Sequence, residues 1–357
     1  MLNNSIRGLL LALAVFCFHT SNGQEQEGAC ITTWYHDKPG AVSISFDDGG
    51  YTQYTEAYPV LEKYSLKATF GIVGEWVREE PSMSAEPNYF EIRKMGWKQL
   101  LELYDHGHEL AAHGYRHERY NKFDPVDTLA RHMVQIKLLI ESRIHQPVLT
   151  IHYPYSFASG NIHEAALRAG FLFGRTGLDT VNSGTPRDMH LLATHSILNA
   201  HEPDSTTFLR WLDQAEGNWL ILMYHNLFSE NSREMSLIHG HNVEYSYSLP
   251  KESFEMQVRE TIYRDYWIAP ISTVGKYIME RDNTQLRFIR CKDKIILVAS
   301  TNLDTRIFNQ PLTLEVNIRW RKVKVTDGLQ DKICETKNNK LLIDINPESV
   351  IIISKTK

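Results

Sequence analysis

Short apolar runs alternate with amphipathic stretches from about Thr32 to Asp282, which predicts repeated strand–helix units. The expected strands are Val42–Phe46, Ala68–Ile72, Glu109–His113, Leu149–Tyr153, Phe171–Phe173, Leu220–Tyr224 and Trp267–Ile271. The expected helices are Trp97–His106, Pro125–Ile144, Ile162–Ala169, Thr206–Gln214 and Ser253–Tyr263. Strands separated by helices usually pair in parallel, so we expect an α/β fold whose sheet is open or closed into a barrel.

The pattern changes after Asp282, where short strands follow one another without a helical period. The expected strands are Ile295–Ala299, Leu312–Val316, Val323–Val325, Leu341–Ile345 and Val350–Ile353. We therefore expect a (β/α) domain over residues 24–283 and a small all-β domain over residues 284–357. The second domain would be either a structural cap or a sugar-binding module.

The first 23 residues have the pattern of a secretory signal peptide. Arg7 gives a charged start, Leu9–Phe18 is apolar, and Ser21–Gly23 offers small and polar residues for cleavage. Ten apolar residues are too few to span a bilayer, which takes about 20. We expect an exported protein, periplasmic or extracellular, with no integral membrane segment after cleavage.

The charge of the chain does not favour a nucleic-acid partner. There are 38 Lys and Arg against 43 Asp and Glu, a net charge of −5, and no basic block. Cys30, Cys291 and Cys334 would remain after cleavage of the signal peptide. In an oxidising compartment Cys291 and Cys334 could form a disulfide, or all three could be free thiols.

Two adjacent carboxylates, Asp47 and Asp48, directly follow a predicted buried strand. They repel each other and lose hydration there, so a bound cation would offset the cost. His113 and His117, four residues apart at the end of another strand, complete a set of three ligands with Asp48. This set suits Zn²⁺, or another divalent transition metal, with a coordination position open. Asp47 would then act as a base.

Two further segments place polar groups at strand ends. Pro154 fixes the turn after a strand, so the backbone N–H of Tyr155 is a candidate donor to a developing oxyanion. His225 ends the apolar strand Leu220–Tyr224. It is either a proton donor to a leaving group or a hydrogen-bonded structural histidine.

Taken in order, these segments resemble the motifs of the polysaccharide deacetylase family, carbohydrate esterase family four. Ser45–Gly49 resembles T-F-D-D-G, His113–His117 resembles H-S/T-x-x-H, His152–Tyr155 resembles R-x-P-Y, and Met223–His225 resembles L-x-H. The resemblance covers about Val42–Tyr277. It implies a distorted (β/α) barrel and metal-dependent removal of acetyl groups from sugars.

The chain departs from the family pattern at three points, the mildest of which is Gly114 in place of a small hydroxyl residue. His152 stands where the family has an arginine that holds the catalytic aspartate, here Asp47. An imidazole is shorter and titrates near neutrality, so we expect it to hold Asp47 less firmly and to make activity sensitive to pH. The family's fourth motif, an acid that partners the proton-donating histidine, has Asp179 as its nearest candidate.

Aromatic side chains near these motifs are candidates for stacking on sugar rings. They are Tyr115, Tyr155, Phe157, Tyr224, Tyr245 and Tyr247. The long polar segment Asn226–Pro250 reads as a loop over the site. Within it, His239 and His241 are either surface residues or additional ligands.

The sequence therefore predicts an exported zinc-dependent hydrolase that removes N- or O-linked acetyl groups from a carbohydrate polymer or oligomer. Two alternatives stay open: a catalytically weakened glycan-binding protein on the same fold, and a hydrolase of a small amide. His152 and the missing fourth motif favour the binding protein, whereas Asp47, His225 and the complete ligand set favour an enzyme.

Overall fold

The structure is a computed structural model that describes residues 28–83, 93–198, 203–229, 247–328 and 330–356. The expected signal peptide lies outside the described residues, as do His239, His241 and Tyr245. Among the described residues, no helix has both the length and the apolar character needed to cross a bilayer.

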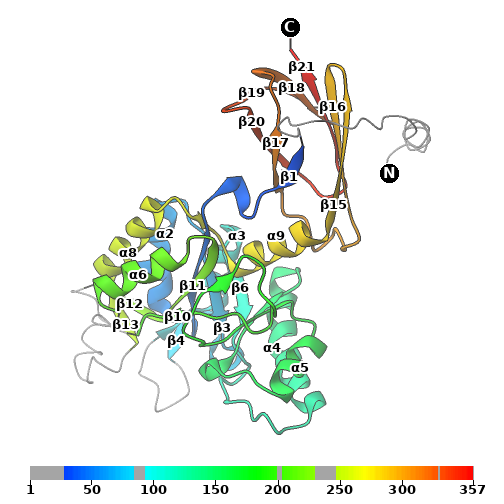
Figure 1. The fold of residues 1–357 in the computed structure, drawn as a ribbon. Helices are drawn as coiled ribbons and strands as arrows, with labels where there is room; N and C mark the ends of the chain where they lie inside the picture. The colour runs from blue at the N-terminus through cyan, green and yellow to red at the C-terminus, as the bar shows by residue number, and fades with distance from the viewer. Residues whose placement is uncertain (1–27, 84–92, 199–202, 230–246, 329, 357) are drawn as a thin grey trace.

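A curled, mostly parallel sheet forms the centre of the larger part of the molecule (Figure 1). Its path is β10 (His195–Ser196), β11 (Asn218–Tyr224), β2 (Ala41–Phe46), β3 (Thr69–Ile72), β6 (Glu109–Ala112), β7 (Thr150–His152) and β8 (Phe173–Arg175), all paired in parallel. β14 (Trp267–Ile268) adds to β2, and β9 (Asn182–Ser183) pairs antiparallel with β11. The predicted α/β class is confirmed as a distorted (β/α) barrel.

Helices connect the strands and cover the sheet. They are α2 (Tyr58–Lys63), α3 (Trp97–Asp105), α4 (Val126–Ile144), α5 (Asn161–Arg168), α6 (Ser205–Gln214), α8 (Lys251–Tyr263) and α9 (Ile271–Asn283). On α4, Leu129, Met133, Ile136 and Ile140 recur every three or four residues and are buried against the sheet. Short pairs, β4 (Ser82–Met83) with β5 (Arg93–Lys94) and β12 (Asn226–Phe228) with β13 (Ser248–Pro250), lie outside the central sheet.

Helix α9 is the main element that the apolar pattern did not predict. The strand expected over Trp267–Ile271 ends at Ile268, and Pro270 precedes the first turn of α9. Proline lacks an N–H and has a fixed φ, so it ends a strand and suits a helix start.

The C-terminal residues are all β, as the sequence predicted, and they form two antiparallel sheets. One contains β15 (Thr284–Cys291), β16 (Lys294–Thr301), β21 (Val350–Lys355), β18 (Lys322–Asp327) and β19 (Gln330–Glu335) in that order. The other contains β1 (Ala29–Ile31), β17 (Leu312–Asn317) and β20 (Lys340–Ile345). Side chains from both sheets form one apolar core. β1, from the N-terminal end of the described chain, lies beside β17 in Figure 1, so this region also contains residues that precede the barrel.

Helix α9 also contacts the C-terminal sheets. The Tyr277 side chain is fully buried, and its hydroxyl donates to the carbonyl oxygen of Thr32 at 3.0 Å. Glu280 accepts the backbone N–H of Gln310 at 3.0 Å, and burial raises the pKa of Glu280 to about 7. A titratable group therefore lies where the barrel meets the C-terminal sheets.

The three described cysteines are free thiols. Cys291 lies on β15 and Cys334 on β19, which are the two edges of the five-stranded sheet. Four strand spacings of about 4.8 Å separate those edges, whereas a disulfide joins Cα atoms about 5.5 Å apart. The pairing of Cys291 with Cys334 is therefore excluded.

Candidate active site

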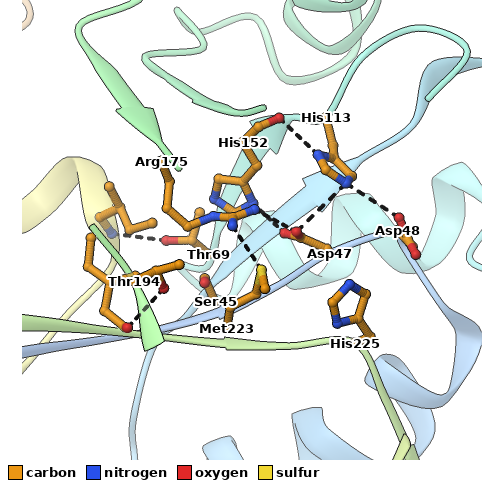
Figure 2. A network of polar contacts seen from close by, with 12 residues as sticks. Ser45, Asp47, Asp48, Thr69, His113, His152, Arg175, Thr194, Met223 and His225 are labelled. Carbon is orange, nitrogen blue, oxygen red and sulfur yellow. Dashed lines mark hydrogen bonds and ion pairs between the residues drawn. The ribbon is translucent and has the colours of Figure 1, made fainter. Parts of the chain in front are cut away.

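Polar side chains gather where the parallel strands of the barrel end (Figure 2). They come from β2, β6, β7, β8 and β11, whose carboxyl ends meet at one edge because the strands run parallel. The residues are Asp47, Asp48, His113, His117, His152, Arg175 and His225.

Three of these side chains are spaced as the ligands of one ion. Asp48 Oδ1 lies 3.4 Å from His113 Nε2 and 3.5 Å from His117 Nε2, and all three residues are buried. Ligand atoms about 2.1 Å from a tetrahedral zinc are separated by roughly 3.4 Å. The structure therefore contains a possible Asp–His–His metal site.

Hydrogen bonding around His113 supports this interpretation. His113 Nδ1 lies 2.8 Å from the carbonyl oxygen of His152, which can only accept, so Nδ1 carries the proton and the lone pair of Nε2 faces Asp48. Asp48 Oδ1 is buried and has no hydrogen-bond partner among the described residues. A buried carboxylate facing two imidazole nitrogens fits a divalent transition metal.

Backbone strain accompanies the site. Asp48, His117 and Tyr155 have φ angles of 74°, 56° and 57°, in the left-handed region that residues other than glycine rarely adopt. A Cβ on Gly50 would lie 2.2 Å from Asn226 Oδ1, so a larger residue there would displace the Asn226 side chain. Strained positions of this kind tend to cluster at functional sites.

Asp47 is held by two side chains. His152 Nδ1 lies 2.7 Å from its Oδ1, and Arg175 Nη2 donates to its Oδ2 at 2.5 Å (Figure 2). Burial opposes ionisation of Asp47, but the charge of Arg175, followed by smaller contributions from two histidines, holds its pKa well below the usual range. Asp47 is therefore a fixed carboxylate beside the possible metal site.

Arg175 was not predicted as a site residue from the sequence. His152 and Arg175 are partners in the register of β7 and β8, so the neighbouring strand provides the guanidinium that was expected at position 152. The signal was an arginine directly after the apolar run Phe171–Gly174, because a charge in a buried strand needs a partner. Because Arg175 also donates to Asp47, the expectation that this carboxylate would be held less firmly is wrong.

The expected titration of His152 near neutral pH is also wrong. His152 is fully buried, and burial, followed by the charge of Arg175, lowers its pKa to about 4. The ring is therefore neutral at pH 7 and donates from Nδ1 to Asp47. Gly71 on β3 leaves the space for it, since a Cβ there would lie 2.6 Å from His152 Nδ1.

Asp179 does not partner His225. Its Oδ1 lies 2.5 Å from His195 Nδ1, and the His195 ring stacks on Trp211 at 4.3 Å. His225 Nδ1 is buried without a hydrogen-bond partner in the part of the chain that the structure describes, and burial lowers the pKa of this ring. Asp179 therefore does not take the place of the fourth-motif acid as a partner of His225.

A cavity of about 380 Å³ opens above these residues. Its lining includes the residues of the possible metal site, Asp48, His113 and His117, and also Asp47 and His225. The half-exposed rings of Tyr155 and Tyr247 line it as well. The Tyr155 ring lies 4.8 Å from the His117 ring, and the Tyr247 ring lies 4.9 Å from the His225 ring. Lys94 and Arg119 add positive charge to the lining.

Two aromatic residues expected at the substrate lie elsewhere. Tyr224 is buried in the core, where its hydroxyl donates to Gln257 Oε1 at 2.9 Å. Tyr224 points away from the cavity because it alternates along β11 with Met223, which does line it. Tyr115 packs against the core beside Gly74 and is not among the residues that line the cavity.

Comparison with known proteins agrees with the motifs. Residues 35–174 match the family model of polysaccharide deacetylases. This span contains Asp47, Asp48, His113 and His117 and ends one residue before Arg175. The chain is 29% identical over 156 residues to a putative polysaccharide deacetylase, YxkH, of Bacillus subtilis, covering 44% of this chain and 50% of the relative. It is 26% identical over 155 residues to the poly-beta-1,6-N-acetyl-D-glucosamine N-deacetylase of Staphylococcus aureus, covering 39% of this chain and 50% of the relative. The chain thus spans about half the length of these curated relatives.

Solved structures of deacetylases are also similar to this chain. The deacetylase PplD of Streptococcus pyogenes, in complex with acetate, is 21% identical and covers 42% of this chain and 62% of its own, with a TM-score of 0.36. A family 4 acetyl xylan esterase of Clostridium thermocellum, in complex with a cobalt ion, is 14% identical and covers 66% of this chain and 89% of its own, with a TM-score of 0.40. The match to the family model over residues 35–174, with Asp47, Asp48, His113 and His117 placed in one cavity, makes this chain similar to the polysaccharide deacetylases.

Proposed function

We propose that this protein is an exported, zinc-dependent hydrolase that removes acetyl groups from a carbohydrate polymer or oligomer. The observation that carries the proposal is the position of Asp47, fixed by Arg175 at 2.5 Å and lying 3.7 Å from His113 Nε2. A candidate base and a candidate metal site therefore share one cavity.

Asp48, His113 and His117 would hold the metal. When bound, a zinc ion would supply Lewis acidity to an acetyl carbonyl and to the attacking water. Asp47 would accept the proton of that water, since its carboxylate is ionised and does not belong to the ligand set. The constraint from His152 and Arg175 would keep it aligned.

Two other groups would complete the reaction. The backbone N–H of Tyr155 would donate to the developing oxyanion. His225 would protonate the leaving nitrogen or oxygen, and the lowering of its pKa by burial makes the protonated ring a stronger acid. The exposed rings of Tyr155 and Tyr247 would stack on a sugar.

A glycan-binding protein without activity is the less favoured alternative. The histidine at position 152, where the family has an arginine, favoured this alternative. Arg175, however, supplies a guanidinium to the Asp47 carboxylate. A hydrolase of small amides would use the same polar residues. The two tyrosines at the cavity favour a saccharide ring instead.

Acetate release by the purified protein, residues 24–357, tests the proposal. The substrates are acetylated chitooligosaccharides, poly-N-acetylglucosamine, peptidoglycan and acetylated xylan, each with zinc and with a chelator. We expect release from at least one glycan that the chelator stops and zinc restores, and no release by Asp47→Asn. Metal-loaded protein that binds a glycan without releasing acetate would support the binding protein, and activity confined to small amides would support the third function.

A further inference from the structure

A second group of potential metal ligands lies outside the cavity. It consists of His163 on α5 and of Asp188 and His190 in the segment between β9 and β10. One ligand atom from each residue lies within 4.8 Å of the others, and none of the three lines the cavity. Their side chains are 29%, 35% and 13% exposed, so an ion could reach them from solution.

The tautomer of His190 leaves a lone pair facing a carboxylate. His190 Nε2 lies 2.8 Å from the carbonyl oxygen of Phe171, which can only accept, so the neutral ring carries its proton on Nε2. His190 Nδ1 therefore faces Asp188 Oδ1 with a lone pair at 3.6 Å, too far for a hydrogen bond. Two lone pairs that face each other at this distance repel unless a cation lies between them. The spacing is close to the roughly 3.4 Å expected between two ligands of a tetrahedral zinc.

The contact between His163 and Asp188 also fits a metal site. His163 Nε2 lies 2.8 Å from Asp188 Oδ2, yet this buried nitrogen has no hydrogen bond of normal geometry to a described residue. The other oxygen, Asp188 Oδ1, accepts the backbone N–H of His190 at 2.8 Å, which fixes the carboxylate between the two imidazoles. One held carboxylate and two imidazoles repeat the donor set of Asp48, His113 and His117.

We infer that His163, Asp188 and His190 form a second site for a divalent transition metal such as Zn²⁺. Two imidazole nitrogens favour zinc, copper or nickel over magnesium or calcium, which prefer oxygen ligands. With three protein ligands, water would complete the coordination. The inference does not rest on the proposed function.

Such an ion would cross-link α5 to the segment that borders β8. Met189 and Leu192 of that segment exchange backbone hydrogen bonds with Gly174, each 2.8 Å, next to Arg175. The carbonyl oxygen of His190 accepts the hydroxyl of Tyr153 at 3.1 Å. The site is therefore structural, and it supports the strand that carries the arginine partner of Asp47.

Zinc stoichiometry of the whole purified protein tests the inference, with zinc alone as the probe. We expect two equivalents for the wild type, one for His163→Gln/His190→Gln, one for His113→Gln/His117→Gln, and none for the fourfold variant. The matched control is His132→Gln, since His132 Nδ1 lies 2.8 Å from Glu118 Oε1 on the surface without a second histidine in the group. This control should retain two equivalents.

Further measurements distinguish loss of the metal site from loss of folding. Asp188→Asn keeps the size of the side chain and should also bind one equivalent, with an unchanged circular dichroism spectrum. Zinc added to His113→Gln/His117→Gln should raise its melting temperature, and this rise should vanish when His163 and His190 are also replaced. Zinc content in folded His163→Gln/His190→Gln equal to that of the wild type, or unchanged zinc in folded Asp188→Asn, would overturn the inference.

Discussion

Arg175 donates to Asp47 across 128 positions of sequence, from the strand next to the one whose motif carries the arginine in the family pattern. The guanidinium also donates to Met223 Sδ at 2.8 Å, so its direction is fixed from two sides (Figure 2). The same electrostatic partner therefore reaches the carboxylate from a different backbone position.

Replacing Arg175 with methionine should lower kcat by roughly 100-fold, because Asp47 loses its alignment. It should also lower the free energy of unfolding by about 3–5 kcal/mol, since a buried carboxylate loses its cationic partner. Zinc content should stay unchanged, because Arg175 contacts none of Asp48, His113 and His117. Kinetics, denaturant unfolding and metal analysis measure the three quantities, and wild-type kcat in the variant would refute the role given to Arg175.

Alanine substitutions of Asp47 and of His113 should differ in their effect on zinc binding. Asp47→Ala should retain zinc but show no turnover, because this carboxylate is not in the ligand set. His113→Ala should lose both, because Nε2 of His113 faces the ion position. Zinc analysis of the two dialysed variants is the measurement, and equal metal loss would contradict the separate roles.

Gly71→Ala should lower kcat by roughly tenfold or more. The new methyl group would lie 2.6 Å from His152 Nδ1 and 3.2 Å from Asp47 Oδ1, so the imidazole must move. In a His152→Ala background the same substitution should have a much smaller effect, because most of the clash is gone. A double-mutant cycle on kcat measures this coupling, and additive effects would show that Gly71 does not act through His152.

Glu280 should make stability depend on pH. Its pKa is raised from 4.5 to about 7 in the folded protein, so between these values the folded state binds more protons than the unfolded state. The free energy of unfolding should therefore fall as pH rises from about 4.5 to 7 and should level off above 7. Glu280→Gln should remove this fall and stabilise the protein at pH 8 by roughly 1–3 kcal/mol.

Urea unfolding at pH 5 and pH 8 measures the Glu280 effect. Glu335→Gln, on an exposed position of β19, is the matched control and should behave as the wild type. A Glu280→Gln variant with the wild-type pH dependence would show that this group does not titrate as described.

Periodicity predicted the barrel well because its strands are short apolar runs with parallel neighbours. It also placed the residues of the candidate metal site at strand ends, where topology brings them together. What it missed depended on contacts between strands: the register that sets Arg175 beside His152, and the exposed turn that lets Asp179 reach His195. Tyr224 was misassigned because the motif gives its neighbourhood but not the face of the strand on which it lies.

The pairing of β1 with β17 joins the N-terminal end of the described chain to the C-terminal sheets. Ala29 aligns with Val316, so the ladder closes only after a ribosome has made the chain through Val316. Until then β1 has no strand partner and Tyr277 on α9 is uncovered. A chain cut after Asn283 would keep both defects, so we expect it to aggregate and not to behave as an independent catalytic unit.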